Sequence, residues 1–105
     1  MTETLTGDQI FIRKLIEIIL VNLNNVNFGV NELAHEPEMS HSGLNRKLKT
    51  IANRTINQLI GEVRLNKALE VLQNESVSAF EVAYKVGFGS PAYFSTCFHE
   101  YFFNN

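Results

Sequence analysis

Polar and cationic side chains that can bind nucleic acid gather between residues 40 and 54. A guanidinium such as that of Arg46 can donate two hydrogen bonds to O6 and N7 of a guanine, and a carboxamide such as that of Asn45 can pair in the same way with N6 and N7 of an adenine. The ammonium groups of Lys47 and Lys49 suit phosphate oxygens, which receive a large share of the hydrogen bonds in protein–DNA complexes. This segment has the chemistry of a DNA contact, provided that one element holds these groups on an outer face.

The positive charge of the chain is concentrated in the same region. Residues 1–38 carry two cations against six acidic residues, a balance of −4, and residues 75–105 carry one cation against three, a balance of −2. Residues 39–74 carry six cations against two acidic residues, a balance of +4, although the net charge of the whole chain is −2. A basic middle segment is typical of a surface that meets phosphates; a solvated basic face is the alternative.

A short stretch rich in histidine and glutamate raises the question of a metal site. The candidate ligands are His35, Glu36, Glu38 and His41. Their spacing matches no standard zinc pattern, Pro37 breaks the helix between them, and the remaining histidine, His99, is far away in the sequence. We therefore expect no metal at this stretch.

The motifs of common enzyme classes do not occur in the sequence, which has no glycine-rich phosphate loop and no nucleophile elbow. The single cysteine, Cys97, precedes Phe98 in a segment with helical spacing, where it is more typical of a small core side chain than of a nucleophile. We expect a protein that is not an enzyme and that needs no cofactor.

Length and composition predict a small helical protein. A chain of 105 residues suffices for one compact domain, or for two very small ones that share a helix. A hydrophobic share of 45% and a charged share of 19% are typical of folded proteins, while two prolines and six glycines offer little turn chemistry for a β protein. No apolar run approaches the roughly 20 residues of a membrane span, no secretory signal is recognisable, and a single cysteine excludes an internal disulfide. We expect an all-α, cytoplasmic protein in which this segment makes no membrane contact.

Apolar residues at helical spacing predict the elements that would hold the polar groups. A first helix is expected with Asp8 as its N-cap and one buried stripe. The stripe consists of Ile12, Leu15, Ile16, Ile19 and Leu23. A second helix covers about residues 30–35 and is stopped by Pro37, and a third runs from the N-cap Ser40 to about Ala52.

A longer fourth helix, at about residues 56–73, carries apolar residues on two different sides. They are Ile56, Leu59, Ile60 and Val63 in its first half, and Leu65, Ala68, Leu69 and Leu72 in its second half. At about 100° per residue these two sets point to nearly opposite faces. The pattern predicts a helix that connects two successive cores.

The segments on either side of this connector repeat each other. The corresponding parts are Glu32-Leu33-Ala34 and Glu81-Val82-Ala83, Met39 and Phe88, and the inward pairs Leu44 with Leu48 and Phe94 with Phe98. The first two correspondences are 49 residues apart and the last 50, as if the second turn held one extra residue. A small alanine lets two helices cross closely, and an apolar turn residue fills the corner between them. The second copy would be a fifth helix over about residues 79–86, ended by Gly87, and a sixth starting near Ser90 with Pro91 in its first turn.

Four blocks of the sequence carry a family resemblance. They are Leu33-Ala34 through Met39-Ser40, Leu44-Asn45-Arg46-Lys47-Leu48-Lys49, Arg64-Leu65-Asn66-Lys67-Ala68, and Glu81-Val82-Ala83-Tyr84-Lys85-Val86-Gly87-Phe88-Gly89-Ser90-Pro91-Ala92-Tyr93-Phe94 continuing to Phe98. With these blocks the chain resembles the AraC/XylS family of bacterial transcription regulators over roughly residues 8–102. The last block also resembles the C-terminal end of hybrid two-component sensor proteins.

The resemblance implies an all-α, homeodomain-like architecture with two helix-turn-helix units. The first unit would cover residues 8–55, the connector helix 56–73, and the second unit 74–105. Both recognition helices would lie on one side and enter successive major-groove segments of double-stranded DNA. The resemblance further implies an activator that forms part of a longer, two-component regulator and that has RNA polymerase as a possible partner.

Matched position by position, the resemblance assigns residues to the two recognition helices. The implied base-reading residues are Ser42, Asn45, Arg46, Pro91, Ala92, Tyr93 and Thr96. The residues expected at DNA phosphates are Ser40, His41, Lys47, Lys49, Arg54, Ser90 and Ser95. Because the sixth helix has little charge, it would read thymine methyl groups and use hydroxyls, and Tyr93 could instead pack at the turn. Arg54, Arg64 and Lys67 flank the connector, and for these three residues a solvated helix charge is an equal alternative to a contact with DNA.

The chain departs from the family pattern in two places. The family commonly has glycine at the position of Glu38 and an apolar residue at Pro37, so a backbone with positive φ is expected at a residue that tolerates it poorly. The family's final helix is apparently absent after Tyr101-Phe102, and we expect association or fraying of the aromatic C-terminal part. A protein-interaction module that has the same fold and binds no DNA remains the alternative function.

Overall fold

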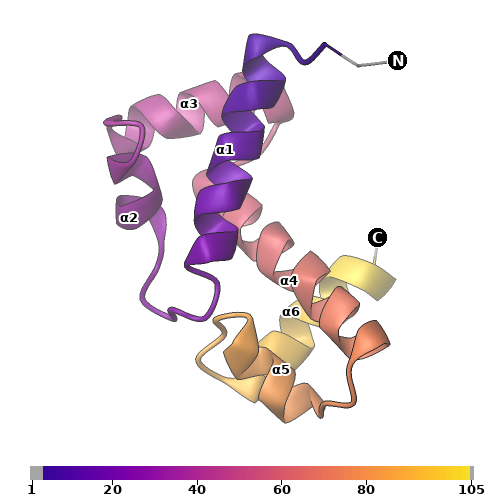
Figure 1. The fold of residues 1–105 in the computed structure, drawn as a ribbon. Helices are drawn as coiled ribbons and strands as arrows, with labels where there is room; N and C mark the ends of the chain where they lie inside the picture. The colour runs from indigo at the N-terminus through magenta and orange to yellow at the C-terminus, as the bar shows by residue number, and fades with distance from the viewer. Residues whose placement is uncertain (1–3, 105) are drawn as a thin grey trace.

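The computed structural model describes residues 4–104, and these form six α-helices without a strand (Figure 1). The helices are α1 (Gly7–Val21), α2 (Val30–His35), α3 (His41–Ala52), α4 (Ile56–Asn74), α5 (Ala79–Lys85) and α6 (Pro91–Phe103). The all-α prediction is confirmed, and four of the six helices start at the residue that the sequence signals indicate. The connector α4 extends one residue further than expected, to Asn74.

The start of α1 differs from the expectation. Its N-cap is Thr6, whose hydroxyl accepts a hydrogen bond from the Gln9 backbone N–H at 3.1 Å, while the Gln9 side chain accepts from the Thr6 N–H at 2.8 Å. Asp8 therefore lies inside the first turn, where its negative charge favours the helix through the dipole. The reciprocal capping box satisfies two N–H groups, which a single Asp8 cap would not do.

The first core is enclosed by α1, α2, α3 and the first half of α4. Its buried residues are Leu15, Ile19, Phe28, Leu33, Ala34, Leu44, Leu48, Ile56, Leu59 and Ile60. The expected partners Ile12 and Ile16 of α1 pack against this core from its edge. The stripe of the first half of α4 is confirmed, with Val63 partly buried beside it.

The second core is enclosed by the second half of α4 with α5 and α6. Its buried residues are Leu65, Ala68, Val71, Val82, Ala83, Val86, Phe88 and Phe94. Two expectations are corrected here. Val71, rather than Leu69, supplies the buried aliphatic side chain near the end of α4. Leu23 lies in the turn after α1 and packs against this second core, not against the first.

The two helix-turn-helix corners have matching backbone geometry. The Met39 N–H donates to the Ala34 carbonyl at 3.1 Å, and the Phe88 N–H donates to the Ala83 carbonyl at 2.8 Å. The residue before each apolar plug has positive φ, 55° at Glu38 and 90° at Gly87. The sequence repeat is thus a structural repeat, and the strained glutamate expected in the first turn is present.

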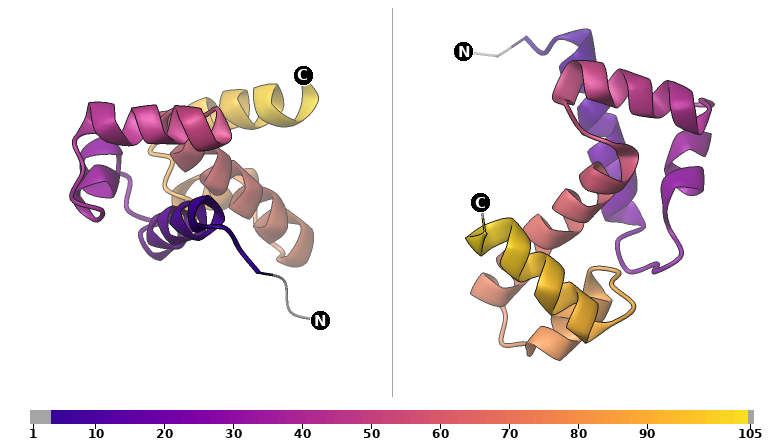
Figure 2. Two further views of the ribbon diagram at one scale, coloured as in Figure 1. Left: turned by 90° about the horizontal axis from the view of Figure 1, so that it is seen from above. Right: turned by 180° about the vertical axis from the view of Figure 1, so that it is seen from behind.

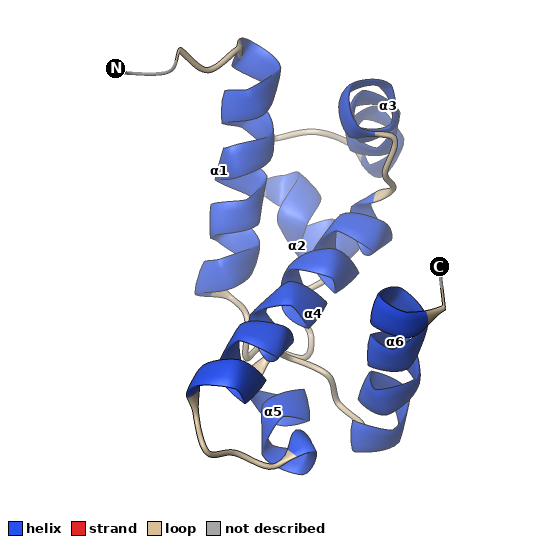
Figure 3. Cartoon of the chain, turned by 90° about the vertical axis from the view of Figure 1, so that its right-hand side faces the viewer, coloured by secondary structure: helices blue, strands red, loops and turns tan. Residues whose placement is uncertain are grey.

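The two helices that are expected to be recognition helices, α3 and α6, lie on the same side of the molecule. In the right panel of Figure 2, which shows the molecule from behind, α3 and α6 are both nearer to the viewer than α1. In the left panel, seen from above, α3 and α6 lie along one edge, and α1 and most of α4 lie on the other side. The view in Figure 3 agrees, since α3 and α6 lie on the side away from α1. Within residues 4–104, no helix is long and apolar enough to cross a membrane.

Candidate nucleic-acid interface

The outer face of α3 carries the residues best placed for contact with a ligand. Leu44 and Leu48 are completely buried, so the side chains opposite to them in the helix point away from the core. Ser42, Arg46 and Lys49 are exposed and share this outer face. His41 is also exposed, in the first turn, and the helix begins at Ser40, whose hydroxyl accepts a hydrogen bond from the Gly43 N–H at 3.1 Å.

Asn45 lies on the flank of α3 rather than on its outer face. It is half-buried, and its Oδ1 accepts a hydrogen bond from the Ile56 backbone N–H at 2.8 Å. That N–H is one of the unpaired donors at the start of α4, so Asn45 helps to cap the connector. Bidentate pairing of Asn45 with an adenine, the role that the family resemblance implies, would compete with this hydrogen bond, and that role stays a prediction.

Lys47 is directed to the opposite flank of α3, toward α1. Its ammonium nitrogen lies 4.2 Å from the centre of the Phe11 ring, a cation–π contact. The two lysines that the sequence assigns together to phosphates therefore have different surroundings. Lys49 faces outward, whereas the ammonium group of Lys47 packs on the Phe11 ring of α1.

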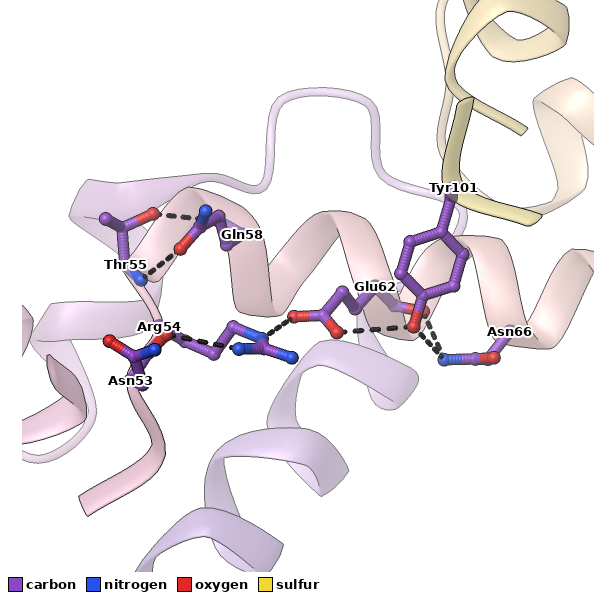
Figure 4. Close-up of polar contacts among 7 residues, drawn as sticks. All are labelled: Asn53, Arg54, Thr55, Gln58, Glu62, Asn66 and Tyr101. Atoms are coloured by element: carbon purple, nitrogen blue, oxygen red, sulfur yellow. Dashed lines mark hydrogen bonds and ion pairs between the residues drawn. The ribbon is translucent and has the colours of Figure 1, made fainter. Parts of the chain in front are cut away.

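Arg54 belongs to a polar network that ends in α6, as Figure 4 shows. Its guanidinium forms an ion pair with Glu62 of the connector, and this hydrogen bond raises the pKa of Arg54. The other carboxylate oxygen of Glu62 accepts a hydrogen bond from the Tyr101 hydroxyl at 3.2 Å, and the Asn66 side-chain amide donates to that hydroxyl at 3.3 Å. The charge of Arg54 is thus paired within the fold, and its expected contact with a DNA phosphate stays a prediction.

Most cations of the basic middle segment, residues 39–74, have partners within the fold. Lys67 pairs with Glu70 at 3.0 Å, and Arg64 donates only to backbone carbonyls. Of the six cations in residues 39–74, all described by the structure, only Arg46 and Lys49 lack any such partner and project into solvent. Within residues 39–74, the cations that remain without such a partner therefore lie on the outer face of α3.

The face of α6 that points away from the second core is uncharged in its first two turns. Ala92 and Thr96 lie one turn apart on this face, and both are exposed. Ser95 is exposed beside them, and Pro91 occupies the first helical position. Ser90 is the N-cap, and its hydroxyl accepts from the Tyr93 N–H at 3.2 Å.

Tyr93 packs at the turn, one of the two alternatives that the sequence left open, and it is also exposed. Its side chain is 63% exposed, yet its ring lies 6.0 Å from that of Phe88, the apolar plug of the turn. A hydrogen bond with the Cys97 side chain raises the pKa of the Tyr93 phenol. The Tyr93 side chain thus packs against the plug of the turn and is still accessible to solvent.

Two further side chains share these outer faces and were missed by the sequence reasoning. Thr50 lies four residues after Arg46 and donates its hydroxyl to the Arg46 carbonyl at 2.9 Å. His99 lies three residues after Thr96 and is exposed. Extending the i, i+3 and i, i+4 pattern by one turn beyond the matched positions would have found both. No group of three potential metal-ligating side chains occurs within residues 4–104.

Comparison with known proteins agrees with this geometry. Residues 33–103 match the family described as helix-turn-helix domain. The chain is 35% identical over 95 residues to "Histidine kinase P4" of Formosa agariphila, covering 90% of this chain and 7% of that protein. It is 40% identical over 80 residues to an uncharacterized HTH-type transcriptional regulator of Pseudoalteromonas carrageenovora, covering 76% of this chain and 43% of that protein.

A solved structure shows the same fold. It is the C-terminal domain of the two-component response regulator yesN from Fusobacterium nucleatum, with a TM-score of 0.76 and 25% identity, covering 87% of this chain and 95% of that one. The chain spans less than half the length of the two curated relatives named above. By sequence match and fold, this chain belongs to the AraC/XylS-type helix-turn-helix family and is a DNA-binding module of the kind that forms part of longer transcription regulators.

Proposed function

We propose that this module binds a specific DNA sequence by placing α3 and α6 in successive major-groove segments on one face of the duplex. The supporting observation is that both helices lie on one side, and that the only outward cations of the basic segment lie on α3 (Figure 2). A helix fits the major groove, where each base pair shows its own pattern of donors and acceptors. The first unit supplies most of the electrostatic affinity.

The proposed roles on α3 follow from which side chains are free. Arg46 and Ser42 read base edges, since they lie early in the helix and face outward. Lys49 and His41 contact phosphates, and the hydroxyl of Ser40 can donate to a phosphate while it caps the helix. Asn45 supports the site indirectly, because its hydrogen bond with the Ile56 N–H holds the start of α4 against α3. Lys47 and Arg54 are left out of the contact set because Phe11 and Glu62 engage them.

The proposed roles on α6 depend on shape rather than charge. Pro91, Ala92 and Tyr93 form the apolar part and would meet thymine methyl groups, and Thr96 adds a hydroxyl on the same face. Ser90 and Ser95 are the phosphate contacts. With no cation on this part of α6, the second unit adds selectivity more than affinity.

The module acts within a larger protein in this proposal. Its relatives include a histidine kinase and a response-regulator domain, so we infer a two-component regulator whose sensory part controls transcription from the cytoplasm. Contact with RNA polymerase and activation of transcription are further inferences from the family, without an assigned surface. The module itself carries out no catalysis.

Selection of binding sites from random duplexes, followed by titration at several salt concentrations, tests the proposal. We expect one enriched motif and a log–log salt slope of about −2 or steeper, because Arg46 and Lys49 displace counterions together with the helix N-termini. A protein-interaction module would enrich no motif. A steep slope without a motif would reduce the function to nonspecific DNA binding.

A further inference from the structure

The side chain of Arg64 joins the two helix-turn-helix units to the connector. It lies in the middle of α4, and its Nη1 donates to the Gly87 carbonyl in the turn of the second unit at 2.8 Å. Its Nη2 donates to the carbonyls of Phe28 at 2.9 Å and Asn25 at 3.2 Å, both in the segment between α1 and α2. One guanidinium therefore holds three backbone carbonyls from two units that are far apart in the sequence.

The setting of Arg64 is unusual for a cation on a connector helix. No carboxylate pairs with it, its Nε is buried without a partner, and desolvation lowers its pKa. A half-buried cation without a counter-ion is costly, so the carbonyl contacts must compensate for lost hydration. The planar guanidinium donates from two separate nitrogens to these carbonyls, a fixed geometry that the single nitrogen of an ammonium group does not reproduce.

Gly87 allows the units to approach closely at this point. A Cβ atom there would overlap the Leu23 carbonyl oxygen and lie 3.0 Å from Cζ of Arg64. Leu23 itself packs against the second core. The loop after α1 and the turn before α6 are thus in direct contact beside Arg64.

A second polar link lies on the opposite side of the connector. Glu62 is two positions from Arg64, about 200° around the helix, and joins Arg54 to Tyr101 of α6 (Figure 4). The connector is therefore tied to the second unit on one side through Gly87 and on the other through Tyr101. Besides these two polar links, the continuous α4 helix and the packing of Leu23 against the second core relate the two helix-turn-helix units.

We propose that Arg64 is a positioning residue that fixes the orientation of α6 relative to α3 and so determines which spacing of two DNA half-sites the module accepts. This role rests on the proposed DNA binding. Arg64 touches no DNA in this arrangement. Its effect is on geometry, since two helices held at one angle can match only one separation of groove segments.

The test compares Arg64→Met with Lys67→Met, which removes the same charge from the same helix, where Lys67 forms its ion pair with Glu70 of α4 itself. Backbone amide residual dipolar couplings of the DNA-free chain report the orientation of the two units. We expect one alignment tensor to fit the wild type and Lys67→Met, and two different tensors to be needed for Arg64→Met. One common tensor with the wild-type orientation in Arg64→Met would overturn the proposal.

Binding to the selected site, and to duplexes with one or two base pairs added or removed between its halves, gives the second readout. Arg64→Met should bind the best duplex about tenfold more weakly and should lose most of the spacing preference that Lys67→Met keeps. If Arg64→Met fails to fold, Arg64→Lys is decisive: a flattened spacing profile supports the proposal, and an unchanged profile overturns it. If the wild type selects no site while the couplings behave as expected, the proposed function fails and the positioning role stands.

Discussion

Polar side chains on α3 divide between those that face solvent and are proposed to contact DNA, and those that contact other parts of the fold. The division follows the direction in which each residue leaves the helix, because Leu44 and Leu48 fix which side is buried. Arg46 projects directly away from these two leucines, whereas Asn45 and Lys47 leave on the two flanks. Neighbouring residues of similar chemistry therefore have different tasks.

Arg46→Ala should lower affinity for the selected site and relax base preference at one position, by about 1–3 kcal/mol of discrimination. The reason is that Arg46 is exposed, unpaired and early in α3. Binding to the site and its single-base variants measures this. Equal weakening on every sequence would assign Arg46 to a phosphate instead.

Lys49→Ala and Lys47→Ala form a matched pair on the same helix. Lys49 faces solvent, so its replacement should reduce the log–log salt slope by about one unit and leave sequence preference unchanged. Lys47 lies over Phe11, so its replacement should change the slope much less and slightly lower the unfolding free energy. Equal slopes for both variants would contradict the division of roles.

Asn45→Ala should lower the unfolding free energy by about 1 kcal/mol, as loss of a helix cap does, while Asn45→Asp should not. An aspartate keeps the acceptor for the Ile56 N–H, and its charge suits the start of α4. Urea unfolding measures the difference. If both variants had the same unfolding free energy as the wild type but lost base preference at one position, Asn45 would be a base-reading residue.

At the scale of elements, the two turns solve one steric problem with different residues. Both need positive φ directly before the apolar plug, and Gly87 meets that need without strain while Glu38 does not. The second turn also has one extra residue, Gly89. The turn residues Met39 and Phe88 are therefore 49 residues apart, whereas the following N-caps Ser40 and Ser90 are 50 residues apart.

Substitutions at the two turn positions, Glu38→Gly and Gly87→Ala, should change stability in opposite directions. Glu38→Gly should raise the unfolding free energy by roughly 0.5–1 kcal/mol, since a left-handed backbone no longer carries a Cβ. Gly87→Ala should lower it by at least about 2 kcal/mol, because its Cβ would meet the Leu23 carbonyl oxygen. Thermal unfolding of both variants provides the check, and a destabilised Glu38→Gly would show that the glutamate is not strained.

Most helix ends, though not the start of α1, and the repeat were predictable from the sequence because they depend on local chemistry. Ser40, Pro37 and Pro91 act within one or two turns of their own position, and the helices begin or end where these residues indicate. The partners of Arg54, Arg64 and Asn45 could not be predicted in this way. Each contact joins residues at least eight positions apart, across elements whose packing no local pattern determines.

At the scale of the whole molecule, two small cores share one connector, and their completeness differs. Leu44 and Leu48 of α3 are fully buried, while Phe94 is the only buried residue of α6, and Phe98, Tyr101 and Phe102 lie at the edge of the second core. The rings of Phe94, Phe98 and Phe102 follow one another at centroid distances of 5.5 and 4.6 Å. Beyond Phe94, α6 therefore contributes only partly buried or exposed side chains to the second core.

Backbone amides in the second half of α6 should therefore exchange with solvent faster than those of α3, because local opening there exposes little buried surface. Phe103 is 68% exposed next to these rings, so the same region should favour self-association at high concentration. Hydrogen exchange resolved by residue and sedimentation measure the two effects. Phe103→Ser should reduce association and leave the protection of α3 unchanged. A monomer in which α6 is as protected as α3 would mean that the aromatic rings stabilise the second unit as fully as the leucines stabilise the first.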